Sequence, residues 1–122
     1  MIKATQPERL FRDRLQYLMR AGNIKAFEYQ PAPIILHKIG RGRKYTPDFK
    51  VIDNNNDVVY YEVKGGFIRE DAMLKFEWAA MLNPDAVFIM MQYKRRQWSL
   101  VKYIKNWKDL TSQIKKQKGG II

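Results

Sequence analysis

The order of elements in the sequence predicts an α/β fold in which helices cover a mixed β-sheet. A helical period with capping signals opens the chain, and strand-like runs around a dense cluster of turn residues follow. A second helical segment then leads into an apolar run suited to a buried strand. With 122 residues and no internal repeat or linker, the chain fits one domain over residues 1–122 with a single hydrophobic core.

The first expected element is a helix over about residues 6–20. Thr5 and Glu8 have the spacing of a capping box, which satisfies backbone donors at a helix start. Gly22 can adopt the left-handed conformation that follows many helix ends. Between these signals, apolar residues recur at roughly helical spacing: Leu10, Leu15, Leu18 and Met19.

Strands are expected next. Residues 26–38 are rich in aromatic and β-branched side chains, but two prolines confine this stretch to a sheet edge or a bend. A basic loop punctuated by glycine follows over residues 40–44. Residues 45–52 and 58–64 are then two strand-like runs, and the turn formers between them predict an antiparallel hairpin.

The turn of this hairpin allows the strand register to be predicted. If the turn is centred on Asn55, Asp48 lies directly across from Glu62. Strand alternation then places an apolar set on one face, which we expect to be core, and a polar set on the other. The apolar set is Phe49, Val51, Val59, Tyr61 and Val63, and the polar set is Asp48, Lys50, Tyr60, Glu62 and Lys64.

The second half of the sequence is less regular. Residues 69–82 predict a helix that an Asn-Pro pair stops, and residues 86–91 predict a strand buried on both faces. After a basic loop at residues 94–96, apolar residues return at helical spacing and predict a C-terminal helix, followed by a loosely ordered tail over residues 115–122. The helix-forming apolar set is Leu100, Tyr103, Ile104, Trp107, Leu110 and Ile114.

The charge balance favours a polyanionic partner. The chain has 23 Lys and Arg against 12 Asp and Glu, a formal net charge of +11. A surplus of this size on a small domain favours nucleic acid over an anionic membrane, although ribosomal and other basic proteins share it. No window is apolar for long enough to cross a bilayer, so we expect no membrane partner.

Cysteine and histidine usage narrows the classes of metal site. The absence of cysteine excludes a disulfide framework and thiolate zinc sites, and with no secretory signal it predicts a cytoplasmic location. His37 is the single histidine, which we expect to be an ordinary strand residue or a substrate contact. A bound cation would therefore be a hard one held by carboxylate oxygens, such as Mg²⁺ or Mn²⁺.

The main candidates for catalytic residues are Asp48, Glu62 and Lys64. Two carboxylates that face each other across a strand pair repel each other, and a divalent cation bound between them makes the arrangement favourable. The backbone carbonyl of Val63 is a further candidate ligand. Lys64 lies two positions beyond Glu62 on the same face, where it would position or help deprotonate a water and offset transition-state charge. This set predicts metal-dependent phosphodiester cleavage.

The segments Thr46–Phe49 and Tyr61–Gly65 resemble the PD-(D/E)xK nuclease signature, and more closely that of small phage Holliday junction resolvases, both the endonuclease I type and related phage resolvase-like domains. The resemblance covers about residues 8–92 and implies a restriction-endonuclease-like three-layer core, a mixed sheet flanked by helices. It also implies that Glu8 completes the metal site and that Lys75 faces the substrate phosphate. A capping role alone would also explain Glu8.

Other basic residues are candidates for contacts with DNA phosphates. The loop of residues 40–44 could be merely solvated, but its glycines and its place before the motif strand favour DNA contacts. The complete candidate set is Arg41, Arg43, Lys44, Lys50, Lys75, Lys94, Arg95 and Arg96.

The resemblance therefore implies a metal-dependent endodeoxyribonuclease that resolves Holliday junctions or other branched DNA in recombination, with Glu8, Asp48, Glu62 and Lys64 as its catalytic residues. Two coordinated cuts imply a homodimer, and the C-terminal helix with Trp107 is a candidate dimer surface. A phage-encoded enzyme acting in the host cell fits this description. Two alternatives stay open: a restriction-, nicking- or repair-type nuclease on linear DNA, and a non-catalytic DNA-binding module with the same fold.

Overall fold

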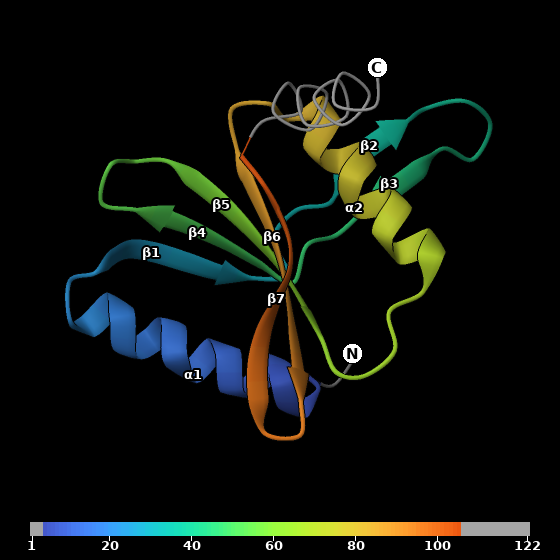
Figure 1. Ribbon diagram of the computed structural model, residues 1–122. Coiled ribbons are helices and arrows are strands. Elements are labelled where there is room, and N and C mark those ends of the chain that lie inside the picture. The colour runs from blue at the N-terminus through green and yellow to red at the C-terminus, as the bar shows by residue number, and fades with distance from the viewer. Residues whose placement is uncertain (1–3, 106–122) are drawn as a thin grey trace, which may run out of the picture.

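A computed structural model of the chain describes residues 4–105. Within this range two helices and seven strands alternate in the α/β manner that the sequence predicts (Figure 1). In chain order they are α1 (Gln6–Arg20), β1 (Ile24–Tyr29), β2 (Ile34–His37), β3 (Arg43–Tyr45), β4 (Phe49–Asp53), β5 (Val58–Lys64), α2 (Glu70–Leu82), β6 (Val87–Lys94) and β7 (Gln97–Ile104).

Five of the strands form one mixed sheet in the order β1-β4-β5-β6-β7. The β5–β6 pair is parallel, because α2 carries the chain back between them, and the other pairs are antiparallel. Strands β2 and β3 form a separate two-stranded ribbon. Helix α1 covers one face of the sheet, while α2 and this ribbon stand on the other (Figure 1). The predicted α/β fold with a mixed sheet is confirmed.

Helix α1 has the predicted bounds and caps. The hydroxyl of Thr5 accepts a hydrogen bond from the Glu8 N–H at 3.3 Å, and the Thr5 N–H donates back to the Glu8 carboxylate at 3.4 Å. At the other end Gly22 has a φ of +81° and its N–H donates to the Met19 carbonyl. The capping box and the glycine stop are therefore both confirmed.

The β4–β5 hairpin has the predicted register. Phe49 pairs with Tyr61 and Ile52 pairs with Val58. The turn is held by the Asp53 carboxylate, which accepts from the backbone N–H groups of Asn55 and Asp57. The turn chemistry thus fixes which residues oppose each other.

The polar face of this hairpin carries the predicted side chains but is partly covered, and Glu62 is the buried residue of that set. The predicted apolar face packs under α1, where Phe49, Val51 and Val63 join Phe11 in one core cluster. The opposite face lies under α2 and the β2–β3 ribbon, and Tyr60 packs there against a second cluster. Alternation placed these side chains correctly, but it could not show that a second layer would partly cover the polar set.

The run 45–52 is not one strand. Tyr45 ends β3, which pairs with β2, and the chain turns through Thr46, Pro47 and Asp48 before β4 begins. Pro47 has no N–H to donate to a ladder, so strand pairing is interrupted at this point. The same effect separates β1 from β2, because residues 30–33 contain the two prolines.

The helix expected after the basic loop is wrong for the part that the structure describes. Arg95 and Arg96 both have positive φ and form a two-residue turn that folds β7 back onto β6. Leu100 and Tyr103 are consequently strand residues. The rest of that predicted helix, with Trp107, and the tail of residues 115–122 lie outside the described residues. Neither helix among residues 4–105 has the length and apolar character of a membrane span.

Candidate active site

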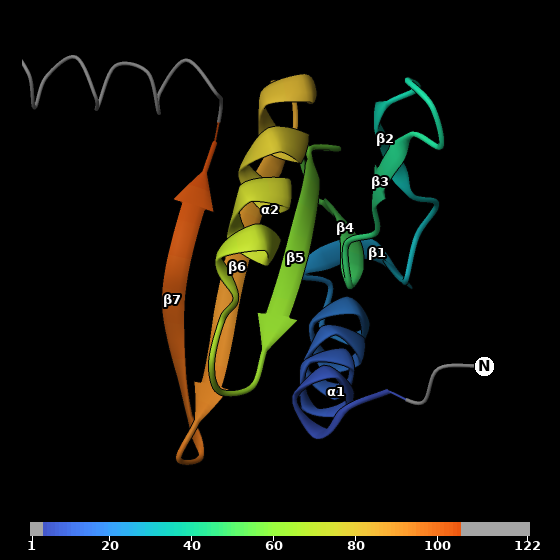
Figure 2. The ribbon, with the colours of Figure 1, turned by 90° about the vertical axis from the view of Figure 1, so that its right-hand side faces the viewer.

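The end of β5 and the start of α1 meet at one end of the sheet (Figure 2). Gly65 makes this possible, because a Cβ at that position would lie 2.9 Å from Cγ of Pro7. A larger residue would push the start of α1 away from the strand. The close approach brings Glu8, in the first turn of α1, beside the motif residues of β4 and β5.

Asp48 lies one residue before β4, and both its backbone and its side chain form hydrogen bonds with β5. Its N–H donates to the Tyr61 carbonyl at 3.1 Å, and its carboxylate Oδ2 accepts from the Val63 N–H at 2.7 Å. Continuing the hairpin register by one position sets Asp48 opposite Glu62, as predicted. The Asp48 carboxylate is therefore held in place by the backbone of the strand that carries Glu62 and Lys64.

Glu62 is the buried charged residue of the described chain, only 7% exposed. Its Oε1 lies 3.6 Å from the Lys64 ammonium, while its Oε2 is buried without a hydrogen-bond partner. Burial, and then the negative charge of Asp48, raise the pKa of Glu62 to about 8. Burial also raises the pKa of Asp48. Ionising these carboxylates therefore costs free energy, which a bound cation would offset.

Two tyrosines border the carboxylates, and sequence reasoning missed both. The Tyr45 hydroxyl is buried without a hydrogen-bond partner, and burial together with the charges of Glu62 and Asp48 raises its pKa. The Tyr29 hydroxyl donates to Glu8 Oε2 at 2.7 Å, and burial and Glu8 raise the Tyr29 pKa to about 12. Both tyrosines end strands that the prolines interrupt, so no local pattern shows which way their hydroxyls point.

Glu8 performs the capping role, and its role in metal binding stays a prediction. Its Oε1 accepts from the Thr5 hydroxyl at 2.8 Å, and its Oε2 accepts from Tyr29. Its charge contributes to the raised pKa of Asp48, so it acts on the same site electrostatically. Among residues 4–105, Glu8 Oε2 accepts only the hydrogen bond from Tyr29, so it retains a lone pair with which it could coordinate a cation.

The donor atoms suit a hard divalent cation. Asp48 and Glu62 provide carboxylate oxygens, one of them buried and unpaired, and such oxygens are the ligands that Mg²⁺ and Mn²⁺ prefer. Among residues 4–105 no group of three or more His, Cys, Asp or Glu side chains is already arranged to hold a metal ion. The two carboxylates thus fit as a pair, with Glu8 and the Val63 carbonyl as predicted additional ligands.

The basic candidates fall into separate groups. Arg95 and Arg96 form the β6–β7 turn, at the same end of the sheet as the carboxylates, with Lys94 beside them (Figure 2). Lys50 lies across from Tyr60 in the β4–β5 pair, on the same face as the carboxylates. Three further candidates, Arg41, Arg43 and Lys44, are exposed on the β2–β3 ribbon.

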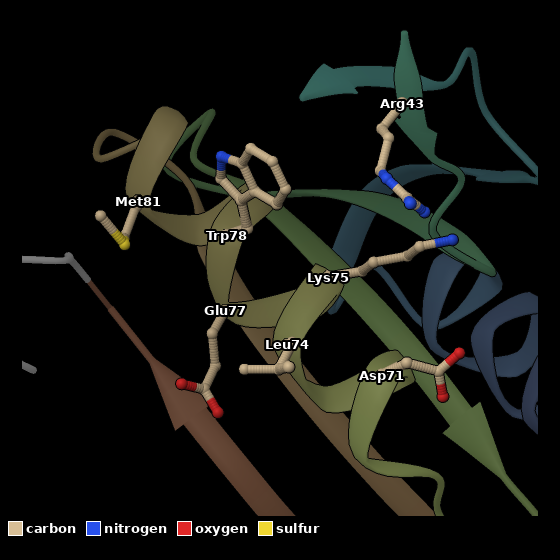
Figure 3. Close-up of a pocket in the computed structure, with 7 residues that line it drawn as sticks. All are labelled: Arg43, Asp71, Leu74, Lys75, Glu77, Trp78 and Met81. Carbon is tan, nitrogen blue, oxygen red and sulfur yellow. The ribbon is translucent and has the colours of Figure 1, made fainter. Parts of the chain in front are cut away.

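Lys75 and Arg43 share a pocket of about 430 Å³ on the outer face of α2 (Figure 3). Both side chains extend into the space between α2 and β3, and the lining beside them is largely apolar. His37 stacks on Trp78 from the ribbon side, with ring centroids 5.6 Å apart. His37 is therefore a packing residue between β2 and α2, in agreement with the ordinary strand role.

Comparison with known proteins adds no assignment to this geometry. No protein-family model, no curated protein and no solved structure matches the chain.

Proposed function

We propose that this chain is a metal-dependent endodeoxyribonuclease of the PD-(D/E)xK type with a restriction-endonuclease-like core. One observation supports the proposal above all: Asp48 and Glu62 converge at the end of a buried hairpin with the Lys64 ammonium 3.6 Å from Glu62. Buried carboxylates with raised pKa values are costly in a protein that makes no use of them. The net charge of +11 gives the chain the electrostatics for a DNA substrate.

Asp48 and Glu62 would hold the cation between the ends of β4 and β5. When bound, Mg²⁺ or Mn²⁺ supplies positive charge to the scissile phosphate and lowers the pKa of an attacking water. The backbone N–H of Val63 keeps the Asp48 carboxylate oriented, so little reorganisation is needed on binding. Glu62 must lose its proton to bind a cation, which links cation affinity to pH.

Lys64 acts beside this pair. Its ammonium, close to Glu62 Oε1, is positioned to donate hydrogen bonds to the attacking water or to a phosphate oxygen. In that position it stabilises the additional negative charge that develops on the phosphate in the transition state. The turn of Arg95 and Arg96 at the same end of the sheet would hold neighbouring phosphates.

We propose branched DNA, such as a Holliday junction, as the substrate, and a homodimer that makes two symmetric cuts. This part of the proposal rests on the resemblance of the motif segments to the phage resolvases. A linear duplex cut as well as a junction would instead indicate a restriction-, nicking- or repair-type enzyme.

The proposal is tested by incubating the full chain with an end-labelled four-way junction and with linear duplexes of the same arm sequences, with Mg²⁺ or with EDTA. We expect Mg²⁺-dependent cuts near the branch. Lys64→Ala should retain binding and cut at least about a hundredfold more slowly, since a positioned proton-transfer group contributes that much. Lys25→Ala is the matched control, because Lys25 bonds to Asn56 at the far turn of the sheet. Binding without any cleavage by the unaltered protein would indicate a non-catalytic DNA-binding module.

A further inference from the structure

The β2–β3 ribbon ends in a tip, residues 38–42, that projects away from the five-stranded sheet (Figure 1). In Figure 2 this tip lies at the top, whereas the end of β5 and the turn of Arg95 and Arg96 lie at the bottom. The tip is therefore separate from the carboxylates, and any role that it has in DNA binding differs from that of the cleaving end.

The tip has a fixed conformation. The N–H of Ile39 donates to His37 Nδ1 at 3.2 Å, and the Ile39 carbonyl accepts from the Gly42 N–H at 2.9 Å. Gly42 has a φ of +73°, and a Cβ there would lie 2.9 Å from the His37 carbonyl oxygen. Both backbone groups of Ile39 are thus paired within the tip, and glycine is required to close it.

The base of the ribbon is anchored to the core. Leu36 of β2 and Tyr45 of β3 are buried in the cluster that packs under α2. His37, whose Nδ1 holds the tip, also stacks on Trp78 of α2. The orientation of the tip is therefore set by the packed part of the molecule rather than by solvent-exposed contacts.

This rigid tip carries one apolar side chain among cations. Ile39 is 83% exposed, one of the most exposed large hydrophobic residues of residues 4–105. Four exposed basic residues flank it in the sequence: Lys38, Arg41, Arg43 and Lys44. A single exposed apolar side chain is ordinary on a protein surface. What distinguishes Ile39 is the combination of four flanking cations with a tip that is closed by backbone hydrogen bonds.

We propose that the β2–β3 ribbon is a DNA wedge, in which the basic residues hold the phosphates of both strands and Ile39 enters between base pairs at a step that is already unstacked. DNA-bending proteins use single apolar side chains flanked by cations in this way, since the phosphates hold the backbone while the wedge separates the bases. A branch point offers such a step at a lower unstacking cost than a continuous duplex. The inference rests on the proposed function for its ligand, DNA, and adds the device that selects distorted DNA.

The alternative use of an exposed apolar side chain among cations is insertion into a membrane surface. Stable insertion needs a larger apolar area than one side chain provides, usually a whole helix face. A single isoleucine on a narrow ribbon is sufficient to separate two bases and too small to anchor a protein to lipid. We therefore assign the ribbon to DNA.

The test uses a four-way junction and a linear duplex with 2-aminopurine at the branch and at the matching central step, in EDTA so that cleavage plays no part. Binding of the unaltered chain should raise 2-aminopurine fluorescence at the branch. We expect Ile39→Ser to lower that rise at least about fivefold while duplex affinity changes less than about threefold, because the phosphate contacts remain. Ile39→Leu should restore the rise. Ile35→Ser is the matched control, since Ile35 is on the same ribbon and 49% exposed.

A rise that is the same for Ile39→Ser and the unaltered chain would overturn the wedge. So would Ile39-dependent sedimentation with phosphatidylserine vesicles in the absence of unstacking. The two proposals can fail separately. If the chain unstacks the branch but never cuts in Mg²⁺, the wedge proposal stands and the nuclease proposal fails. If the chain cuts without unstacking the branch, the nuclease proposal stands and the wedge proposal fails.

Discussion

The two regions that we propose for DNA are built in opposite ways. At the end of β5, Glu62 is buried and Asp48 is partly buried, and the negative charge of Asp48 raises the cost of ionising Glu62. At the tip of the β2–β3 ribbon, the charges are exposed and of one sign, and backbone hydrogen bonds fix the shape. Substitutions at the first region should therefore change stability and chemistry together, whereas substitutions at the second should change DNA binding alone.

The largest effect is expected for Asp48→Asn. The amide keeps the size of the side chain and can still accept from the Val63 N–H, but it lacks the negative charge that would hold a cation. We expect Mg²⁺-dependent cleavage to fall by about two to three orders of magnitude, the amount that a metal ion's charge stabilisation is worth. Single-turnover cleavage of a junction measures this. A rate within a few-fold of the unaltered chain would show that Asp48 holds no catalytic cation.

Glu62→Gln should change stability and cleavage together, in opposite directions. Because the folded-state pKa of Glu62 is raised to about 8, the unfolded chain releases this proton at lower pH, so stability falls as pH rises from the ordinary glutamate range to about 8. Glutamine mimics the protonated form, so without metal at pH 8.5 the variant should be more stable by about 1–3 kcal/mol. The two proteins should match below pH 4. Thermal unfolding in EDTA across this range measures the difference.

The same variant should also cleave DNA more slowly, by no more than Asp48→Asn, so it should be more stable and less active. Added Mg²⁺ should stabilise the unaltered chain more at pH 8.5 than at pH 5.5, since cation and proton compete for the carboxylates. A less stable Glu62→Gln variant at high pH would contradict the picture of a costly buried charge.

Gly65→Ala tests whether the close approach of α1 organises the site. The new methyl group would lie 2.9 Å from Pro7 Cγ and displace the first turn of α1, at a cost of about 1–3 kcal/mol. Cleavage should fall beyond what the lost stability explains. Gly22→Ala is the control, because its Cβ meets nothing within 4 Å and only its positive φ is strained. Equal activity losses in both variants would remove the special role of Gly65.

The smallest effect is expected for Arg41→Gln on the ribbon tip. Loss of one exposed phosphate contact should weaken DNA binding several-fold and lower the slope of log affinity against log salt by about one. The melting temperature should stay unchanged, because Arg41 is exposed and the tip is held by Gly42 and His37. A change in melting temperature without a change in salt slope would show that Arg41 stabilises the fold and does not contact DNA.

Local patterns predicted much of the fold. Three local motifs each require a particular residue type for their backbone conformation or hydrogen bonds: the capping box, the glycine stop and the turn at Asp53. The bounds of α1 and the β4–β5 register therefore follow from the sequence. The pairing of Asp48 with Glu62 followed from that register. These are short-range relations, which a single sequence contains.

Most of the errors involve contacts between elements rather than patterns within one element. Partial burial of the polar hairpin face depends on α2 and the ribbon packing over it. Strand β7 replaced the expected helix because the turn of Arg95 and Arg96 places it beside β6, and pairing with an existing edge outweighs a weak helical period. The roles of Tyr29 and Tyr45 depend on hydroxyl directions that no spacing rule contains.

The central claim is that the Asp48–Glu62 pair is a cation site, and calorimetric titration of Mn²⁺ tests it most directly. The titration is done at pH 8 with the free chain, so that no cleavage occurs and no DNA phosphate binds Mn²⁺. We predict saturable Mn²⁺ binding with proton release, lost in Asp48→Asn and kept in Lys25→Ala. No Mn²⁺ binding by the unaltered chain, or equal binding by Asp48→Asn, would contradict it.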